Sequence, residues 1–287
     1  MNQQLYAGPA QAPAGMTVHR DLAYVANGHA RQNLDLYLPS DGQQLPLIIW
    51  VHGGAFRMGS KEGLEFDAVP LEYLALGYAV ASINYRLSQH ALFPAQIEDC
   101  KAAVRWLRAH AEQFKLDANR FGVWGPSAGG HLAAMLGTTG AVTAFEVGEH
   151  LNVSSRVQAV VDYFGPTDFL QMDDQRPPDG MLHNPPDSPE SQLIGGAIQE
   201  HKQRVAQANP ITYVTNDAPP FLIVHGDRDP LVPYQQSALL DAALRQAGVP
   251  VTFYPVVDAG HGGFTDPRVP ELTQAFFTKH LKPREVL

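Results

Sequence analysis

Residues 120–139 read RFGVWGPSAGGHLAAMLGTT, and this stretch decides the fold. A short apolar run at 120–124 leads into Gly-Pro-Ser-Ala-Gly at 125–129, and small and apolar residues suited to a helix follow. A serine placed between glycines at a strand–turn–helix junction has its Oγ exposed, while the glycines let the strand and helix backbones pass closely. The stretch therefore predicts a sharp turn with Ser127 as a nucleophile.

Outward from this turn, the chain alternates between strand-like and helix-like runs. Short, mostly apolar runs, typical of parallel strands covered on both faces, lie at 46–51, 78–83, 120–124, 157–163 and 221–224. Apolar stripes that recur every three to four residues lie at 94–114, 234–247 and 271–281. The alternation predicts an α/β fold, with a mostly parallel, doubly wound sheet and helices on both faces.

Two regions depart from this rhythm. Near the N-terminus, the runs at 17–25 and 33–38 look like strands, and the second alternates Leu with polar residues, as in an antiparallel strand with one wet face. Residues 165–210 are dense in Pro and Asp. We expect one domain over 1–287, with 165–210 as an irregular insert either near the functional site or on an unrelated part of the surface.

A glycine-rich loop, His52-Gly53-Gly54-Ala55-Phe56, follows the apolar run at 46–51. Such a loop can turn its N–H groups toward one point, and each preorganised donor aimed at an oxyanion contributes about 3–4 kcal/mol. The expected donors are the amides of Gly54 and Ala55, joined by the amide of Ala128 at the start of the helix that follows Ser127. We expect His52 to be structural and to hold the loop in place.

Two further motifs follow strands in the C-terminal part of the chain. HGDRDPLVP at 225–233 comes after 221–224, and GHGGF at 260–264 comes after VTFYPVV. Asp229 precedes a proline and is biased toward extended geometry, so we predict that it orients His261, the general base, while Asp227 accepts backbone N–H groups of a turn. The order Ser127, Asp229, His261 is the order of a known triad arrangement.

Other reactive side chains have simpler interpretations. His131 follows the serine in the small-residue helix, where packing or hydrogen bonding is more common than catalysis. Three histidines, at 52, 225 and 261, lie on different loops without ligand-type spacing, so we expect no metal site. Cys100, the single cysteine, lies on the core-facing stripe of a helix and reads as a small buried hydrophobe.

Composition excludes several classes of protein. The formal net charge of −9 repels phosphate backbones, so we expect no nucleic-acid partner. No stretch approaches the roughly 20 apolar residues of a membrane span, so we expect no membrane partner. The first 15 residues lack the basic and apolar regions of a signal peptide. We therefore expect a cytoplasmic protein, or a secreted one whose signal peptide has been removed.

Taken together, the motifs at 52–56, 125–129, 225–233 and 260–264, with NYRLS at 84–88 and FPAQIED at 93–99, resemble a known family. It is the group of bifunctional feruloyl and acetyl-xylan esterases, close to the hormone-sensitive-lipase-like esterases. The resemblance runs from about Val18 to Leu281, and Ala55, where the latter group usually has a third glycine, places the chain nearer the former. It implies an α/β-hydrolase fold, no cofactor and small acyl esters as substrates.

The expected function is therefore hydrolysis of small or aromatic acyl esters, such as acetyl or feruloyl groups on sugars, through an acyl-enzyme on Ser127. Amide cleavage, as in arylformamidases that share an HGG loop, is a second interpretation. A non-catalytic ligand-binding relative is a third, although such proteins usually lose a triad residue.

Overall fold

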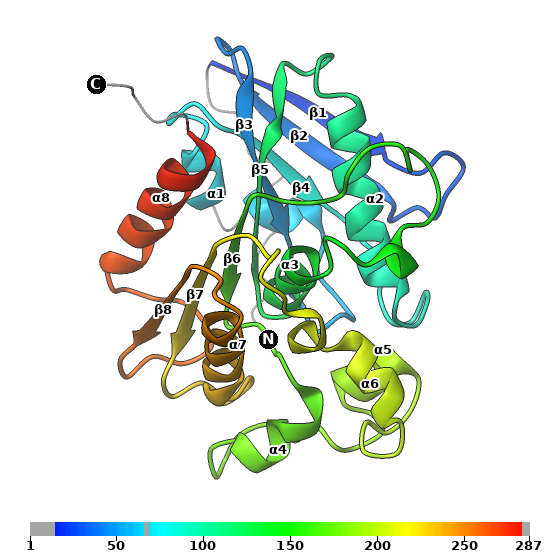
Figure 1. The fold of residues 1–287 in the computed structure, drawn as a ribbon, viewed down its shortest axis with the longest axis vertical. Coiled ribbons are helices and arrows are strands. Elements are labelled where there is room, and N and C mark those ends of the chain that lie inside the picture. Colours follow the sequence, from blue (N-terminus) through cyan, green and yellow to red (C-terminus); the bar gives the residue numbers. More distant parts are fainter. Residues whose placement is uncertain (1–14, 66–68, 283–287) are drawn as a thin grey trace, which may run out of the picture.

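The computed structural model describes residues 15–65 and 69–282. Eight strands form one sheet in the order β1-β2-β4-β3-β5-β6-β7-β8, in which β3 to β8 pair in parallel and β2 pairs antiparallel with both β1 and β4 (Figure 1). The strands are β1 (Met16–Ala23), β2 (Asn33–Pro39), β3 (Leu45–Val51), β4 (Ala79–Ile83), β5 (Leu116–Pro126), β6 (Ala159–Tyr163), β7 (Phe221–Gly226) and β8 (Val251–Val256). The predicted α/β fold class is confirmed.

Helices cover both faces of the sheet. One face carries α2 (Ala95–Ala109), α3 (Ala128–Thr138) and α7 (Gln235–Gln246), and the other carries α1 (Val69–Glu72) and α8 (Arg268–Leu281). Short 3-10 helices are η1 (Lys61–Glu65), η2 (Thr143–Phe145), η3 (Phe169–Gln171) and η4 (Pro210–Tyr213). The runs predicted at 94–114, 234–247 and 271–281 correspond to α2, α7 and α8, with ends that differ by at most five residues.

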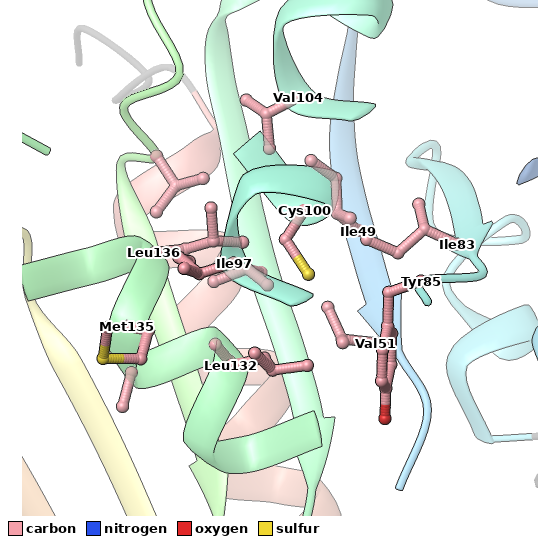
Figure 2. Close-up of a cluster of buried hydrophobic side chains, with 14 of the residues drawn as sticks. Ile49, Val51, Ile83, Tyr85, Ile97, Cys100, Val104, Leu132, Met135 and Leu136 are labelled. Atoms are coloured by element: carbon pink, nitrogen blue, oxygen red, sulfur yellow. The ribbon is translucent and has the colours of Figure 1, made fainter. Parts of the chain in front are cut away.

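The core on the α2 and α3 face shows why apolar stripes specify this layer. Figure 2 shows Ile97, Cys100 and Val104 of α2 among side chains of α3 and the neighbouring strands. All three are fully buried, which confirms the core position predicted for the cysteine thiol. Removing such side chains from water contributes roughly 1.5–3 kcal/mol for each large aliphatic residue.

The strand β2 corrects one expectation from the sequence. Its alternating pattern predicts a wet face, yet Asp35 and Tyr37 are buried, as are Leu34 and Leu36. The Asp35 carboxylate is paired with Lys61 Nζ at 2.8 Å and with Arg20 Nη1 at 3.2 Å. Paired charges tolerate burial. Asp35 in β2 therefore belongs to a buried ion cluster and not to a solvent-facing side of the strand.

Residues 165–210 contain short helices joined by irregular segments. The helices are α4 (Met172–Gln175), α5 (Pro189–Ile194) and α6 (Lys202–Ala208). The hydroxyl of Ser188 caps α5 by accepting from the amide of Ser191, and Pro189 occupies the first turn, where a missing N–H costs nothing. In Figure 1 these helices gather at the end of the sheet toward which β7 and β8 point.

No helix in the described residues is long and apolar enough to span a bilayer.

Candidate active site

The serine turn predicted from the sequence lies between β5 and α3. Ser127 has φ 56° and ψ −121°, a strained backbone for a residue with a side chain, and its amide donates to Tyr163 O at 2.8 Å. A β-carbon at Gly129 would lie 2.0 Å from the carbonyl oxygen of Val51. Only glycine therefore allows α3 to cross the end of β3 this closely, and the strand–turn–helix prediction is confirmed.

The start of α3 provides the donors expected at this position. Ala128 is the first residue of the helix, and amides of a first helical turn have no intrahelical acceptor. Ser127 makes no side-chain cap hydrogen bond, so its Oγ is not committed to closing the helix. A free hydroxyl beside unpaired amides at a helix N-terminus suits a reaction that develops negative charge.

The glycine-rich loop follows β3 and contacts the serine turn directly. A β-carbon at Gly53 would lie 2.9 Å from Pro126 O and 3.5 Å from Ser127 Cβ. The next residues take left-handed backbone conformations, with φ 116° at Gly54 and 54° at Ala55. Such conformations are uncommon for residues with side chains and gather at functional sites. The loop thus lies against the predicted nucleophile.

His52 holds this loop, as the sequence predicted. Its Nδ1 lies 2.7 Å from Gly53 O, and its Nε2 lies 3.0 Å from Nη2 of Arg31. Because a guanidinium only donates, Nε2 accepts and Nδ1 carries the proton. Burial, reinforced by the charge of Arg31, lowers the pKa of His52 to about 4. The ring is therefore neutral at pH 7 and unsuited to charged interactions.

Arg31 is a residue of this site that no sequence motif indicated. It lies on the loop between β1 and β2, far from the serine in the chain. Its guanidinium also donates to Tyr85 O at 2.8 Å and to Gly59 O at 2.9 Å. One side chain thus connects both ends of the glycine-rich loop to the chain that follows β4.

On the other side of β5, the loop after β7 carries the predicted acid. Asp229 Oδ2 lies 2.6 Å from His261 Nδ1, and Oδ1 accepts from the amides of Leu231 and Val232 at 2.8 and 3.0 Å. Burial alone raises the pKa of this carboxyl. Hydrogen bonds from His225 and His261 outweigh that effect and hold the pKa of Asp229 well below its usual range.

Asp227 accepts a backbone N–H, as expected, but from the loop after β8 and not from its own turn. It is exposed, and its Oδ1 accepts from the amide of Asp258 at 2.8 Å. Of the two carboxylates in this motif, Asp229 is therefore the one paired with His261.

The loop after β8 brings His261 to the same edge of the sheet as Ser127. The end of β6 links the two, because the carbonyl oxygen of Tyr163, its last residue, accepts from the serine amide, and the ring of the next residue, Phe164, packs 4.6 Å from the His261 ring. The imidazole is 17% exposed, enough for access from solvent. The structure thus gathers the nucleophile, base and acid predicted from the sequence on neighbouring loops.

The segment 165–210 packs against these loops. Ala208 O lies 2.6 Å from His131 Nε2, in the helix after the serine, and the amide of Met181 donates to Pro230 O at 2.8 Å beside the acid. His131 is fully buried, and burial lowers its pKa to about 4. It therefore has the hydrogen-bonding role predicted for it, and residues 165–210 contact both the helix after Ser127 and the loop that carries Asp229.

Within residues 15–65 and 69–282, no group of three or more His, Cys, Asp or Glu side chains has an arrangement that could hold a metal ion. The chemistry available at this edge is that of a hydroxyl, an imidazole, a carboxylate and backbone amides.

The parallel sheet, the strained serine after β5 and the Asp229–His261 pair place the chain in the class of α/β-hydrolase folds. The chain belongs to the BD-FAE family, whose profile matches residues 34–244. The resemblance found in the sequence motifs is therefore confirmed.

Individual relatives agree with this class. The chain is 33% identical to Esterase LipC of Mycobacterium tuberculosis over 85% of its own length. It spans between 53% and 60% of the length of three such mycobacterial relatives. A truncated carbohydrate esterase from gut microbiota is 34% identical with a TM-score of 0.84, covering 92% of this chain and 95% of that one. The bifunctional GH43-CE of Bacteroides eggerthii is 35% identical with a TM-score of 0.83, covering 91% of this chain and 38% of that one.

Proposed function

We propose that the chain hydrolyses carboxylic esters through an acyl-enzyme formed on Ser127. The observation that carries this proposal is the 2.6 Å bond between Asp229 Oδ2 and His261 Nδ1, which fixes the imidazole with Nε2 available as a base. The strained turn holds the serine hydroxyl at the same edge of the sheet. Nucleophile, base and orienting acid are the parts that serine acyl transfer requires.

The steps follow from these positions. Ser127 Oγ attacks the ester carbonyl carbon while His261 Nε2 takes the hydroxyl proton. Amides of Gly54, Ala55 and Ala128 donate to the oxyanion of the tetrahedral intermediate. The imidazolium, stabilised by Asp229, then protonates the leaving alcohol as the C–O bond breaks. Water, activated by the same imidazole, attacks the acyl-enzyme and releases the acid.

The substrate class in this proposal is a small or aromatic acyl ester on a carbohydrate. A similar solved structure, 34% identical to this chain, is named a carbohydrate esterase. A cavity of about 310 Å³ lies beside the site, between the residue before the nucleophile and the residue after the base. Its walls include Trp50, Trp124, Pro126, Phe164, Gly262 and Phe264. Aromatic walls favour a flat acyl group, which supports feruloyl beside acetyl esters.

A substrate panel tests the proposal. Turnover of p-nitrophenyl acetate and butyrate is compared with the palmitate, with an aryl formamide, and with acetylated and feruloylated xylo-oligosaccharides. We expect the short esters to exceed the palmitate, and the sugar esters to be cleaved. Faster cleavage of the palmitate would indicate a lipase, and preference for the formamide would indicate an amidase.

The role of the serine is tested by Ser127→Ala. Deleting the attacking oxygen is expected to lower kcat by about 10⁶-fold, the scale seen when a serine hydrolase loses its nucleophile. The melting temperature should change little, because this hydroxyl makes no cap bond in the fold. Peptide mapping after labelling with a serine-directed phosphonate should find the adduct on this residue. A folded variant with near wild-type turnover contradicts the assignment.

A further inference from the structure

A second histidine contacts the acid of the candidate triad. His225, near the end of β7, is fully buried. Its Nε2 lies 3.1 Å from Asp229 Oδ2 and 3.0 Å from Val232 O, and its Nδ1 lies 2.7 Å from Ser237 Oγ on α7. Both ring nitrogens therefore have partners, in a part of the core where a purely apolar side chain would need none.

The partners determine which nitrogen carries the proton. A carboxylate oxygen and a carbonyl oxygen can only accept, so Nε2 of His225 must be protonated to face both. Nδ1, the other ring nitrogen, lies 2.7 Å from the hydroxyl of Ser237, which can donate to it. This serine is itself fully buried, so the bond is shielded from solvent. The acceptors at Nε2 thus place an N–H toward Asp229, and Ser237 holds the opposite edge of the ring in that orientation.

The carboxylate of Asp229 consequently receives donors on all sides. Oδ2 lies between His261 Nδ1 and His225 Nε2, while Oδ1 takes the two amides of the following turn. The two amides hold Oδ1 in place, whereas the position of Oδ2 depends on its two imidazole partners. Without His225, Oδ2 would lose a buried donor on the side away from His261, and the carboxylate could tilt from the base.

We infer that His225 is a positioning residue for catalysis, which holds Asp229 Oδ2 in line with His261 Nδ1 and is itself held by Ser237. This inference rests on the proposed ester hydrolysis and assigns a role to a residue outside the Ser127–His261–Asp229 set. It acts through the acid and touches no substrate.

Two polar substitutions separate positioning from packing. His225→Gln can keep an amide N–H near the place of Nε2, whereas His225→Asn can reach only the place of Nδ1, so it keeps the bond to Ser237 and loses the one to Asp229. With p-nitrophenyl acetate we expect the Gln variant to stay within about 10-fold of wild-type kcat. The Asn variant should fall by about 10²-fold at unchanged KM, the cost of a small misplacement of a catalytic group.

A spectroscopic readout makes the test independent of turnover. The proton between His261 Nδ1 and Asp229 gives a low-field ¹H NMR signal, identified by its loss in Asp229→Asn. We expect the signal to persist in His225→Gln and to shift or vanish in His225→Asn. If the wild type cleaves no ester, the proposed function fails while this comparison still decides the role of His225.

The inference is overturned if the Gln and Asn variants lose equal activity with an unchanged signal, or if the Asn variant keeps wild-type kcat. Should both variants fail to fold, Ser237→Ala decides instead. Loss of the bond that holds the His225 ring in place should lower kcat by about 3- to 10-fold at constant KM, and an unchanged kcat and signal would then contradict the role.

Discussion

Two histidine–glycine pairs end strands on either side of the serine turn, and they act differently. His52-Gly53 follows β3, and His225-Gly226 ends β7. Both imidazoles are buried, but the first faces the Arg31 guanidinium and the second faces the Asp229 carboxylate. The partner across the ring decides which nitrogen holds the proton and what the ring supports. The histidine after β3 thus positions the loop with the proposed backbone donors, whereas the histidine at the end of β7 positions the carboxylate of Asp229.

The largest loss of kcat should come from substitution of Asp229, the charged residue at the β7 end. Asp229→Asn keeps the shape of the side chain but removes the anion that both His225 and His261 face. We predict that kcat falls by about 10⁴-fold, as when a triad histidine is left in the wrong tautomer. The measurement is kcat on p-nitrophenyl acetate beside thermal melting. A folded variant that retains most of its activity would mean that the β7 side does not supply the orienting charge.

The neutral imidazole of His52, at the β3 end, should instead affect how the free energy of unfolding changes with pH. The pKa values of His52 and His131 are lowered by burial to about 4, so below pH 6.5 the unfolded chain takes up protons that the folded chain does not. Stability from each is present above pH 6.5 and is lost as the pH falls toward 4, by up to about 3 kcal/mol.

Asp162 has the opposite sign. Burial raises its pKa to about 7, so its contribution falls as the pH rises from 3.8 to 7. We expect net loss of stability on acidification, measured by urea unfolding at pH 7, 6 and 5. His52→Gln should make this slope shallower by about 1.4 kcal/mol per pH unit, the value for one proton. An unaltered slope would show that His52 is not the neutral buried group assigned here.

Next in size is a displacement of the donor loop. Gly53→Ala places a β-carbon 2.9 Å from Pro126 O, and a backbone atom cannot move aside cheaply. The loop should shift away from Ser127, and we predict a loss of about 10²-fold in kcat. Gly63→Ala is the matched control, because a β-carbon there meets nothing within 4 Å. Equal activity of both variants would show that contact between loop and turn is unimportant.

Sequence alone predicted those parts of this comparison that depend on local pattern. The turn at Ser127, the loop at 52–56 and the choice of Asp229 over Asp227 each follow from residues near a strand end. Arg31 did not follow, because its contacts depend on how distant loops meet. The contact of His225 with Asp229 spans only four residues, but it depends on how the turn after β7 is folded, which the sequence motif does not specify. The repeated His-Gly pair at 52–53 and 225–226 was the available signal for the second of these.

Two other departures, at α5 and at Asp35, have different causes. The start of α5 has a recognisable sequence signal, because Ser188 is a typical N-cap and Pro189 is typical of a first turn. The many Pro and Asp residues around it favour an irregular segment instead, so the helix is not predicted. The sequence predicts a solvent-facing Asp35, because the partners that allow its burial, Lys61 and Arg20, come from other segments and cannot be recognised along the strand. Buried polar residues are the positions at which alternation along a strand gives the wrong face.

The smallest expected effect concerns Asp227, which lies two residues from the acid yet outside its network. Its carboxylate is exposed and accepts one hydrogen bond, from the amide of Asp258 in the loop that leads to His261. Asp227→Asn keeps an acceptor oxygen at this position, and solvent can replace whatever is lost. We therefore predict destabilisation of about 1 kcal/mol or less and a kcat within a few fold of wild type. Because Asp227 and Asp229 share one loop, measuring kcat and melting temperature for both Asn variants separates charge at His261 from integrity of the loop. Loss of turnover in Asp227→Asn at unchanged stability, with an active Asp229→Asn, would reverse the assignment and place the orienting carboxylate at the exposed position.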